Sequence, residues 1–482
     1  MAATRAWISR HRAVIVATLI LAASYIAFVA WNHGRYETHA FDLGIFTQAV
    51  WHLGRFELPA STVRDVANLF GDHFHPIIAL FAPWTWIFPA DWVLVIGQAI
   101  LLALTLPASY ALARQLQITP RAALVAAIAA GSAPGFAPAL GFDVHEIAFA
   151  APLIPLVFLF TEQRRWKLLT ATTLLLLLTK ESMGFYLAAI GLTVIIRRRF
   201  KAGLALVGVG IIYTLLVTSL VLPRLNPEEG FRHWERYEHL AASPVQMPVQ
   251  LIAHPGRFMN GLADAPEKRE FVAATIGGAG LLPLLGLAAW PLLGLSLLEV
   301  VWSGFPSEWS FGFHYALLPS IAASVGAIYG LAWLSRRQTK RYLALIGAIV
   351  MAVGTIAGHL GTPSFRIIGN ENVAARPTAV WNEALKRIPA DASVSASDAF
   401  VPRLAEREVI YRYPRIREAQ WIIIDPRAPS YPYASEQIRT EQAALSRDPR
   451  WTTVFIDGTL TVFSRVDPAF IPDRLDDPAT RR

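Results

Sequence analysis

The sequence predicts an α-helical polytopic membrane protein with a soluble α/β domain at its C-terminal end. Of its 482 residues, 54% are hydrophobic and only 16% are charged, against roughly 25% charged residues in soluble globular proteins. The apolar residues come in blocks about as long as a bilayer crossing. After residue 360 these blocks end, and 17 Lys and Arg are balanced by 16 Asp and Glu. A protein that is soluble throughout its length is therefore excluded.

Eleven apolar runs predict about eleven transmembrane helices. The first, residues 13–31, follows basic residues as a signal peptide would, but no small-residue cleavage site follows it, so we interpret it as a retained anchor. The other runs are residues 92–113, 122–140, 147–161, 168–179, 183–196, 202–222, 272–287, 289–302, 315–334 and 342–360.

Two of these boundaries rest on charge rather than on hydropathy. One helix over residues 168–196 would place basic clusters on both sides of the membrane, so we divide it at Lys180 and Glu181. Its first half then has only twelve residues, about 18 Å of helix against a bilayer core of about 30 Å, and its turn should lie below the outer surface. The uncharged link between 272–287 and 289–302 is also kept as a turn, because one merged helix would turn the basic residues 336–341 outward.

The basic residues predict the orientation of the chain. Before residue 361 there are 26 Lys and Arg, and 16 of them fall on one side of the membrane with a single acid, Glu162. Cytoplasmic loops carry such an excess of Lys and Arg. We therefore expect a cytoplasmic N-terminus and an extracytoplasmic C-terminal domain.

The predicted organisation is a transmembrane domain over residues 1–360, with a long first outer loop over 32–91, and an extracytoplasmic α/β domain over 361–482. A second, polar outer loop covers residues 223–271. In the tail, an Asp457-Gly458 turn joins two strand-like runs and is a strong hairpin signal. The expected strands are 394–396, 409–413, 421–424, 452–456 and 459–464, and the expected helices are 380–388 and 435–446.

The first outer loop contains an amphipathic pattern. Phe41, Ile45, Ala49, Leu53 and Phe56 recur every three or four residues, which predicts a helix lying in the interface with its apolar side in lipid or against the bundle. Asp42 stands at its beginning. From this pattern alone, a helix N-terminal acid favoured by the helix dipole explains Asp42 better than a functional role does.

Polar clusters recur at the ends of apolar segments, all on the expected outer face. Ionisable groups there are costly unless they are paired or solvated in a cavity, so their convergence predicts a polar site. The alternative for Lys180 and Glu181 is that they simply pair with groups on neighbouring helices. The clusters contain Asp72, His73 and His75, then Asp143, His145 and Glu146, then Lys180 and Glu181, and finally His314 and Tyr315.

Metal chemistry is possible for part of this set. Asp72, His73, His75, His145 and Glu146 are ligand types that zinc or manganese accepts. Their spacing matches no specific metal signature, so a divalent metal (Mg, Mn or Zn) stays an open alternative. The absence of cysteine excludes thiolate ligands, disulfides and cysteine nucleophiles. The net charge of +8 lies beside hydrophobic segments, so we expect a lipid bilayer as partner and no nucleic acid.

Several motifs resemble a known family. The chain is similar to the bacterial polytopic membrane family named domain of unknown function two-zero-seven-nine, over nearly its whole length. That family is in turn similar to the GT-C glycosyltransferases. The resemblance rests on Phe41-Asp42-Leu43-Gly44-Ile45-Phe46-x-Gln48, Gly71-Asp72-His73-Phe74-x-Pro76, Ala82-Pro83, Pro89, Gln98, Phe142-Asp143-x-His145-Glu146, Lys180-Glu181 and His314-Tyr315.

The resemblance implies a GT-C-like fold in the bacterial cytoplasmic (inner) membrane and transfer of a sugar from a polyprenyl-phosphate donor. The acceptor, a glycan, lipid or protein on the extracytoplasmic face, is not indicated. In GT-C enzymes an acidic residue of the first outer loop is catalytic, and Asp42 holds that place. The chain departs from the family pattern at Ser182, where an Asp is expected after Glu181.

Inverting transfer needs a base for the acceptor hydroxyl and stabilisation of the departing lipid phosphate. We expect Asp42 as the base, with Asp143 or Glu146 orienting the acceptor or holding a metal. The expected substrate-binding residues are Gln48, Asp72, His73, His75, His145, Lys180, Glu181, Arg224, His314 and Tyr315, of which His73, Lys180 or Arg224 could face the phosphate.

The rival interpretation is a transporter or flippase of a lipid-linked or polar substrate, which also has interrupted helices and buried charges. Two features favour the enzyme: no internal repeat is visible, and the charges gather on one face only. A third interpretation, an anchored tail that only binds partners, leaves the polar clusters unexplained.

Overall fold

The computed structural model describes residues 2–226, 232–243, 246–336, 342–362, 376–428 and 433–467. By packing, the chain forms two compact units. The first comprises Met1–Ile26, Phe70–Ile77 and Gln98–Gly369, and the second comprises Ala27–Leu69, Ile78–Gly97 and Asn370–Arg482.

Within the described residues, six helical spans are long and apolar enough to cross a membrane. They are His11–Gly34, Ala90–Gln115, Glu146–Gln163, Phe200–Leu225, His314–Ser335 and Tyr342–Gly361. Five shorter apolar helices are Pro76–Trp86, Pro120–Gly131, Trp166–Leu177, Met183–Ile196 and Leu287–Val301.

The α-helices before residue 362 are α1 (Ala2–Gly34), α2 (Ile45–Gly54), α3 (Ala90–Ala103), α4 (Thr105–Gln115), α5 (Pro120–Gly131), α6 (Phe136–Gly141), α7 (Ala150–Gln163), α8 (Trp166–Leu177), α9 (Met183–Ile196), α10 (Phe200–Leu216), α11 (Leu222–Leu225), α12 (Met247–Ala253), α13 (Pro255–Asn260), α14 (Pro266–Gly278), α15 (Trp290–Val301), α16 (Leu317–Ser335) and α17 (Tyr342–Gly361), as far as the structure describes this part of the chain.

The predicted count of about eleven transmembrane helices is not confirmed. The expected crossing at 272–287 is interrupted, because α14 ends at Gly278 and the chain turns at Gly280 (φ +67°) and Leu281 (φ +58°). A Cβ at Gly280 would lie 2.8 Å from the Met351 backbone, so the turn needs glycine for space as well as for conformation. A hydropathy profile does not reveal this interruption, because the residues of the turn are themselves apolar or glycine.

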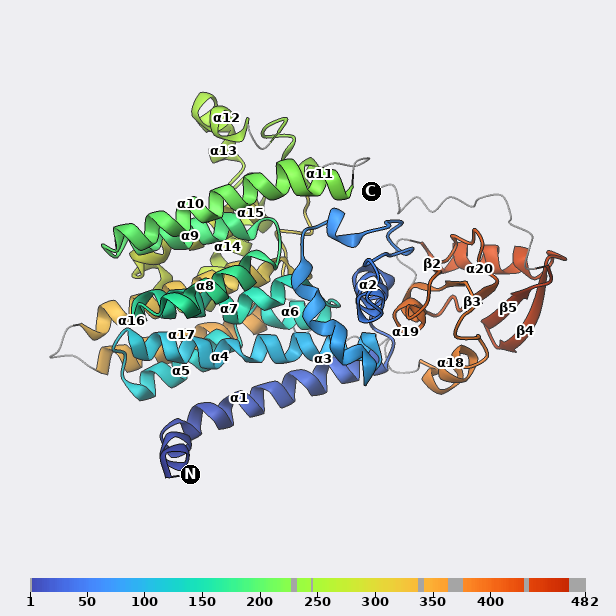
Figure 1. Cartoon of the computed structure of the whole chain (residues 1–482), viewed down its shortest axis with the longest axis horizontal. Helices are drawn as coiled ribbons and strands as arrows, with labels where there is room; N and C mark the ends of the chain where they lie inside the picture. Colours follow the sequence, from blue (N-terminus) through green and yellow to red (C-terminus); the bar gives the residue numbers. More distant parts are fainter. Residues whose placement is uncertain are drawn as a thin grey trace. The chain divides into compact units, whose positions relative to one another are not determined.

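The division of residues 168–196 is confirmed. α8 and α9 are separate helices, and Lys180 and Glu181 lie in the turn between them. α9 then lies along α10 (Figure 1). A Cβ at Gly184 would stand 2.4 Å from the carbonyl oxygen of Gly210. Small residues at such crossings let two helix backbones approach closely in a membrane.

The helices of the first unit differ sharply in burial. In α16, 89% of the apolar window is buried, against 11% in the span formed by α1. α16 contacts α4, α5, α7, α15 and α17, so it is the central helix of this unit. The exposed apolar surface of α1 is what a helix facing lipid presents.

The second unit contains a mixed five-stranded sheet in the order β2-β1-β3-β5-β4. β1 is parallel to β2 and β3, whereas β5 pairs antiparallel with β3 and β4. The strands are β1 (Val394–Ala396), β2 (Ile410–Arg412), β3 (Trp421–Ile424), β4 (Trp451–Asp457) and β5 (Leu460–Arg465), and the helices are α18 (Thr378–Leu385), α19 (Val401–Leu404) and α20 (Ser435–Leu445). α20 lies beside the sheet (Figure 1), and its Ile438 and Leu445 belong to the buried cluster there.

The predicted strands, hairpin and helices of the tail are thus confirmed, with every boundary within three residues of the expected one. Gly458 has φ +58° in the hairpin, as the Asp-Gly signal requires.

The first outer loop packs with the tail inside the second unit. The ring of Tyr36 meets Trp381 and Phe400 edge to face at 5.0 and 5.7 Å between centroids, and Arg403 lies over Tyr36 at 4.1 Å. Loop and tail therefore share one core. The division of the chain at residue 360 into a membrane domain and an outer domain stays a prediction.

Candidate functional site

The turn between α8 and α9 carries a buried ion pair of the first unit. The Lys180 Nζ lies 2.8 Å from Glu146 Oε1, and both side chains are largely buried. Glu146 begins the 3-10 turn Glu146–Phe149 that leads into α7. Removing two charges from water is costly, so such a pair needs close geometry and further polar contacts to persist.

Glu181, the neighbour of Lys180, makes polar contacts of its own beside this pair. Its carboxylate accepts hydrogen bonds from His73 Nδ1 at 2.7 Å and from the backbone N–H of Phe74 at 3.0 Å. Burial raises the pKa of Glu181, but the hydrogen bond from His73 and the positive charge that His73 carries at acidic pH outweigh it and lower the pKa to about 2. Glu181 is therefore ionised at neutral pH. Because an ionised carboxylate only accepts, His73 must carry its proton on Nδ1 and keep a lone pair on Nε2.

His73 also faces the second outer loop. Its ring stacks on His233 at 3.7 Å between centroids with an interplanar angle of 11°. His233 Nε2 lies 3.4 Å from Asp72 Oδ1. Burial, followed by the nearby His233 and Lys180, lowers the pKa of His73 to about 4. His73 is therefore neutral at pH 7.

The loop between α6 and α7 is fixed by Gln98 of α3. The Gln98 side chain donates to the carbonyl oxygens of Ala139 at 2.9 Å and Asp143 at 2.7 Å, and accepts from the His145 N–H at 2.8 Å. This holds Asp143 with φ +52°, an unusual conformation for a residue other than glycine. His145 stacks on His314 at 3.4 Å between centroids.

The predicted residues of the first unit therefore group around these turns. Asp72, His73, His75, Glu146, Lys180 and Glu181 lie in one buried network, in which His75 is 1% exposed. His145, His314 and Tyr315 form an aromatic stack. Arg224 stands apart from both groups: it is exposed, and it donates to the carbonyl of Leu220 one turn earlier. Its role towards a phosphate stays a prediction.

A second set of polar residues in the first unit was not predicted from the sequence. The Arg236 Nη1 lies 3.1 Å from Glu308 Oε1, and Tyr186 donates to the Glu299 carboxylate. Tyr237 donates to the Glu299 carbonyl at 2.8 Å. Glu299 could have been found, since a carboxylate inside an apolar run marks a functional or paired position.

In the second unit, the segment that carries Asp42 is held by the tail. Asp42 lies in the π-helical turn Ala40–Gly44 before α2. The Asp398 carboxylate accepts from the Ala40 N–H at 3.3 Å, and the Arg412 guanidinium lies 4.4 Å from the centre of the Phe41 ring. A Cβ at Gly44 would meet Val401 at 2.8 Å, so the turn is packed directly on α19.

This packing changes the interpretation of the expected interfacial helix. Every side chain from Leu43 to Val50 is buried, so the helix is not exposed along one side. Gln48 was expected to bind substrate. Its Nε2 donates to the carbonyls of Arg407 at 3.0 Å and Glu408 at 3.1 Å, and its Oε1 accepts from the Thr62 N–H at 2.8 Å. With both ends of its amide occupied, Gln48 connects loop and tail.

The second unit offers a further group of residues that could ligate a metal, whereas metal ligation by the expected residues stays a prediction. The acids Glu146 and Glu181 are engaged by Lys180 and His73, as described above. Among the described residues of the second unit, His52, Glu57 and Glu408 bring one ligand atom each within 4.8 Å of one another. These three could hold a divalent cation, although Glu57 already pairs with Arg55 at 3.1 Å.

The comparison with protein families decides the class of the chain. Residues 33–457 match the family described as predicted membrane protein (DUF2079). The chain belongs to this family. No curated protein matches this DUF2079 chain in sequence.

Solved structures show which fold this DUF2079 chain shares. The structure of ArnT from Cupriavidus metallidurans bound to undecaprenyl phosphate is similar at a TM-score of 0.55 and 13% identity, covering 92% of this chain and 97% of ArnT. The arabinofuranosyltransferase AftD from Mycobacteria is similar at a TM-score of 0.50 and 13% identity, covering 94% of this chain but 40% of AftD. The DUF2079 chain therefore has the fold of the GT-C glycosyltransferases.

The expected site residues are divided between the two units. Asp42 and Gln48 belong to the second unit, whereas His73, Glu146 and Lys180 belong to the first. That Asp42 shares one cavity with the buried network stays a prediction.

Proposed function

We propose that this chain is a membrane glycosyltransferase that transfers a sugar from a polyprenyl-phosphate donor to an acceptor on the extracytoplasmic face. The observation that carries the proposal is the buried network of Glu146, Lys180, Glu181 and His73 in a chain with the GT-C fold. Charges so costly to bury are retained where a polar substrate is handled. The undecaprenyl phosphate bound by ArnT supports the donor class.

The network supplies a cation for the departing phosphate. Lys180 has three N–H donors, and Glu146 accepts one of them at 2.8 Å. Burial lowers the pKa of Lys180, but Glu146 and Glu181 outweigh it and raise the pKa above its ordinary value. Lys180 therefore stays charged, and its contact with Glu146 fixes the direction of its ammonium group. Its two other donors can face a lipid phosphate, so we assign Glu146 to holding Lys180.

His73 supplies a hydrogen-bond acceptor. The Nδ1–H of His73 donates its hydrogen bond to Glu181. The Nε2 lone pair of His73 can therefore accept a hydrogen bond from a hydroxyl of the donor or acceptor sugar. A pKa near 4 makes His73 a weak base, so it orients a hydroxyl and does not deprotonate it. His233 fixes the plane of the His73 ring by stacking.

The base in this proposal is Asp42. Its carboxylate takes the proton of the acceptor hydroxyl as the oxygen attacks the anomeric carbon, and the bond from that carbon to the lipid phosphate breaks on the opposite side. The configuration at the anomeric carbon is therefore inverted. The buried Asp143 is the second acid that could orient the acceptor.

The orientation belongs to the same proposal. The excess of Lys and Arg on one side supports an N-terminus in the cytoplasm of a bacterial cell and a tail outside its inner membrane. The polar turns then open on the outer face, where the lipid tail of the donor stays in the bilayer and its sugar reaches the site.

A reconstitution experiment tests the proposal. The full chain is placed in liposomes with polyprenyl phosphates that carry radiolabelled hexoses or pentoses, together with bacterial envelope material as the source of acceptor. We expect the label to leave one donor and appear in an acceptor. Movement of an intact donor between leaflets without cleavage would instead indicate a flippase.

A further inference from the structure

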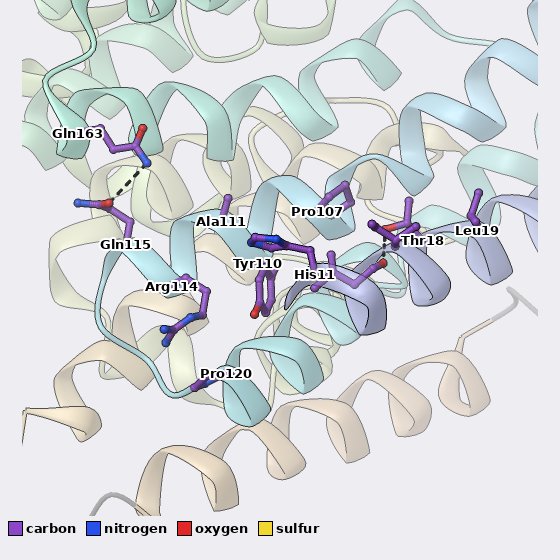
Figure 2. A pocket seen from close by; sticks show the side chains of 12 residues that line it. His11, Thr18, Leu19, Pro107, Tyr110, Ala111, Arg114, Gln115, Pro120 and Gln163 are labelled. Carbon is purple, nitrogen blue, oxygen red and sulfur yellow. Dashed lines mark hydrogen bonds between the residues drawn. The ribbon is translucent and has the colours of Figure 1, made fainter. Parts of the chain in front are cut away.

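A large cavity lies in the first unit, away from the buried network. It has a volume of about 830 Å³ and lies between α1 and α4, with the end of α7 beside it (Figure 2). This size is typical of small-molecule sites, which occupy about 300–1,000 Å³. α7 and the turn before it run from Glu146 in the network to Gln163 at the cavity, about 26 Å at the rise of an α-helix. The two sites are therefore about a bilayer core apart.

One end of the cavity is polar and basic. It is lined by His11, Arg114, Gln115 and Gln163, and none of the described residues that line the cavity is Asp or Glu. The Arg114 Nη1 donates to the carbonyl of Ile118, which fixes the guanidinium in place and leaves its other N–H groups for a ligand.

The two glutamines add hydrogen-bonding capacity at this end. Gln163 donates to Gln115 at 3.5 Å, drawn as a dashed line in Figure 2. Its own Oε1 is buried without a partner among the described residues. A buried acceptor without a partner costs free energy, and a ligand with a hydroxyl group at this place would satisfy it.

The other end of the cavity is apolar. It is lined by Val14, Ile15, Leu19 and Pro107. Thr18 and Tyr110 also line the cavity, and the Thr18 hydroxyl donates to the Val14 carbonyl at 2.8 Å. α1 and α4 run in opposite directions (Figure 1), so Leu19 and Pro107 both lie about 12 Å along their helices from the polar end. The cavity therefore matches a molecule with an anionic head and a hydrocarbon chain.

We propose that this cavity binds an anionic phospholipid of the bilayer, with its phosphate at Arg114 and His11 and one acyl chain along Val14, Leu19 and Pro107. Basic pockets between transmembrane helices bind anionic head groups in this way. The polar end lies at the face where the chain gathers its basic residues, including Arg121 at the start of α5. The site is independent of the proposed transferase activity.

Lipid binding to the purified, delipidated full chain tests the proposal. Native mass spectrometry counts adducts of phosphatidylglycerol, of phosphatidylcholine with the same acyl chains, and of decaprenyl phosphate. We expect phosphatidylglycerol to bind at least about fivefold more tightly than phosphatidylcholine, the effect of roughly one Arg near an anionic lipid surface. Arg114→Gln should abolish this preference, and Ala111→Trp, which fills the cavity, should weaken both phospholipids.

Arg121→Gln is the matched control. It removes the same charge from the neighbouring turn, but Arg121 is exposed and does not line the cavity, so the preference should remain. Equal binding of the two phospholipids by the parent would overturn the proposal, as would equal losses in Arg114→Gln and Arg121→Gln. Displacement of phosphatidylglycerol by an equimolar amount of decaprenyl phosphate would also overturn it, since the occupant would then be a polyprenyl lipid.

Discussion

The Lys180 ammonium lies 2.8 Å from the Glu146 carboxylate, across 34 residues of sequence and two apolar helices. Neither residue has a strong structural reason to be charged in this environment, because a well-packed apolar pair of the same size is often as stable as a buried ion pair. Substitutions in this pair can therefore distinguish an effect on stability from an effect on activity.

Lys180→Met should destabilise the protein by about 3–5 kcal/mol, because Glu146 is left buried without its cation. Adding Glu146→Gln to this variant should recover most of the loss in melting temperature, measured in detergent. The transfer activity should not recover, because Lys180 is proposed to contact the phosphate. Lys268→Met is the control, since it removes another buried lysine, whose partner Asp264 is exposed, and it should leave activity per folded molecule intact. Recovery of activity in the double variant would contradict the role of Lys180.

Stability should fall on acidification because of His73. Its pKa is lowered from 6.5 to about 4 in the fold, so between these values the unfolded chain binds more protons than the folded chain. The free energy of unfolding then decreases as the pH falls from 6.5 to 4, by about 1–3 kcal/mol. Burial lowers the pKa of His75 as well, which adds to this loss.

Melting temperatures of the parent and His73→Gln in the same detergent, between pH 7 and pH 4.5, measure this slope. The variant should lose at least half of it, whereas His254→Gln, which changes an exposed histidine, should keep it. An unchanged slope in His73→Gln would show that other groups control the acid response.

The tail should position the candidate base. The hydrogen bond from the Ala40 N–H to Asp398 is charge-assisted, and its loss in Asp398→Ala should lower the amide-exchange protection of residues 40–44 by about 10- to 100-fold. Turnover should fall with it, while donor binding is kept. Asp448→Ala, which removes an acid of the tail paired only locally with Arg450, is the control and should change neither.

Much of the fold was predictable because it depends on local pattern. Strands, hairpin and the break at Lys180-Glu181 follow from turn residues, alternation and charge, all of which act over a few residues. Helix length was less predictable. The helix before Gly280 ends where Gly280 approaches the backbone of Met351, 71 residues later in the chain. A hydropathy profile carries no information about such a contact.

The candidate site was predictable only in part for the same reason. His73 and Glu181 were singled out because they end apolar segments, but their partner His233 lies in a polar loop whose composition says nothing of stacking. Gln48 appeared functional within its motif, yet its amide meets backbone carbonyls 359 and 360 residues later in the chain. Such a contact leaves no trace in the sequence around either partner.

Reporter fusions test the orientation. Alkaline phosphatase, which is active only outside the cytoplasm, should be active when fused after Arg366 and inactive when fused after Arg198. The reverse pattern would place the polar turns on the cytoplasmic face and remove the basis for an extracytoplasmic site.

The most direct test of the account is the transfer rate of Asp42→Asn in the full chain, reconstituted with the donor that the parent uses. Asn caps helices about as well as Asp, so a purely structural role predicts a loss of at most about 1 kcal/mol and near-normal turnover. Removal of a general base typically lowers the rate by a factor of roughly 10² to 10⁴, and we predict a loss of this size with donor binding retained. Turnover within a few-fold of the parent would contradict the account and leave Asp143 as the acid to test.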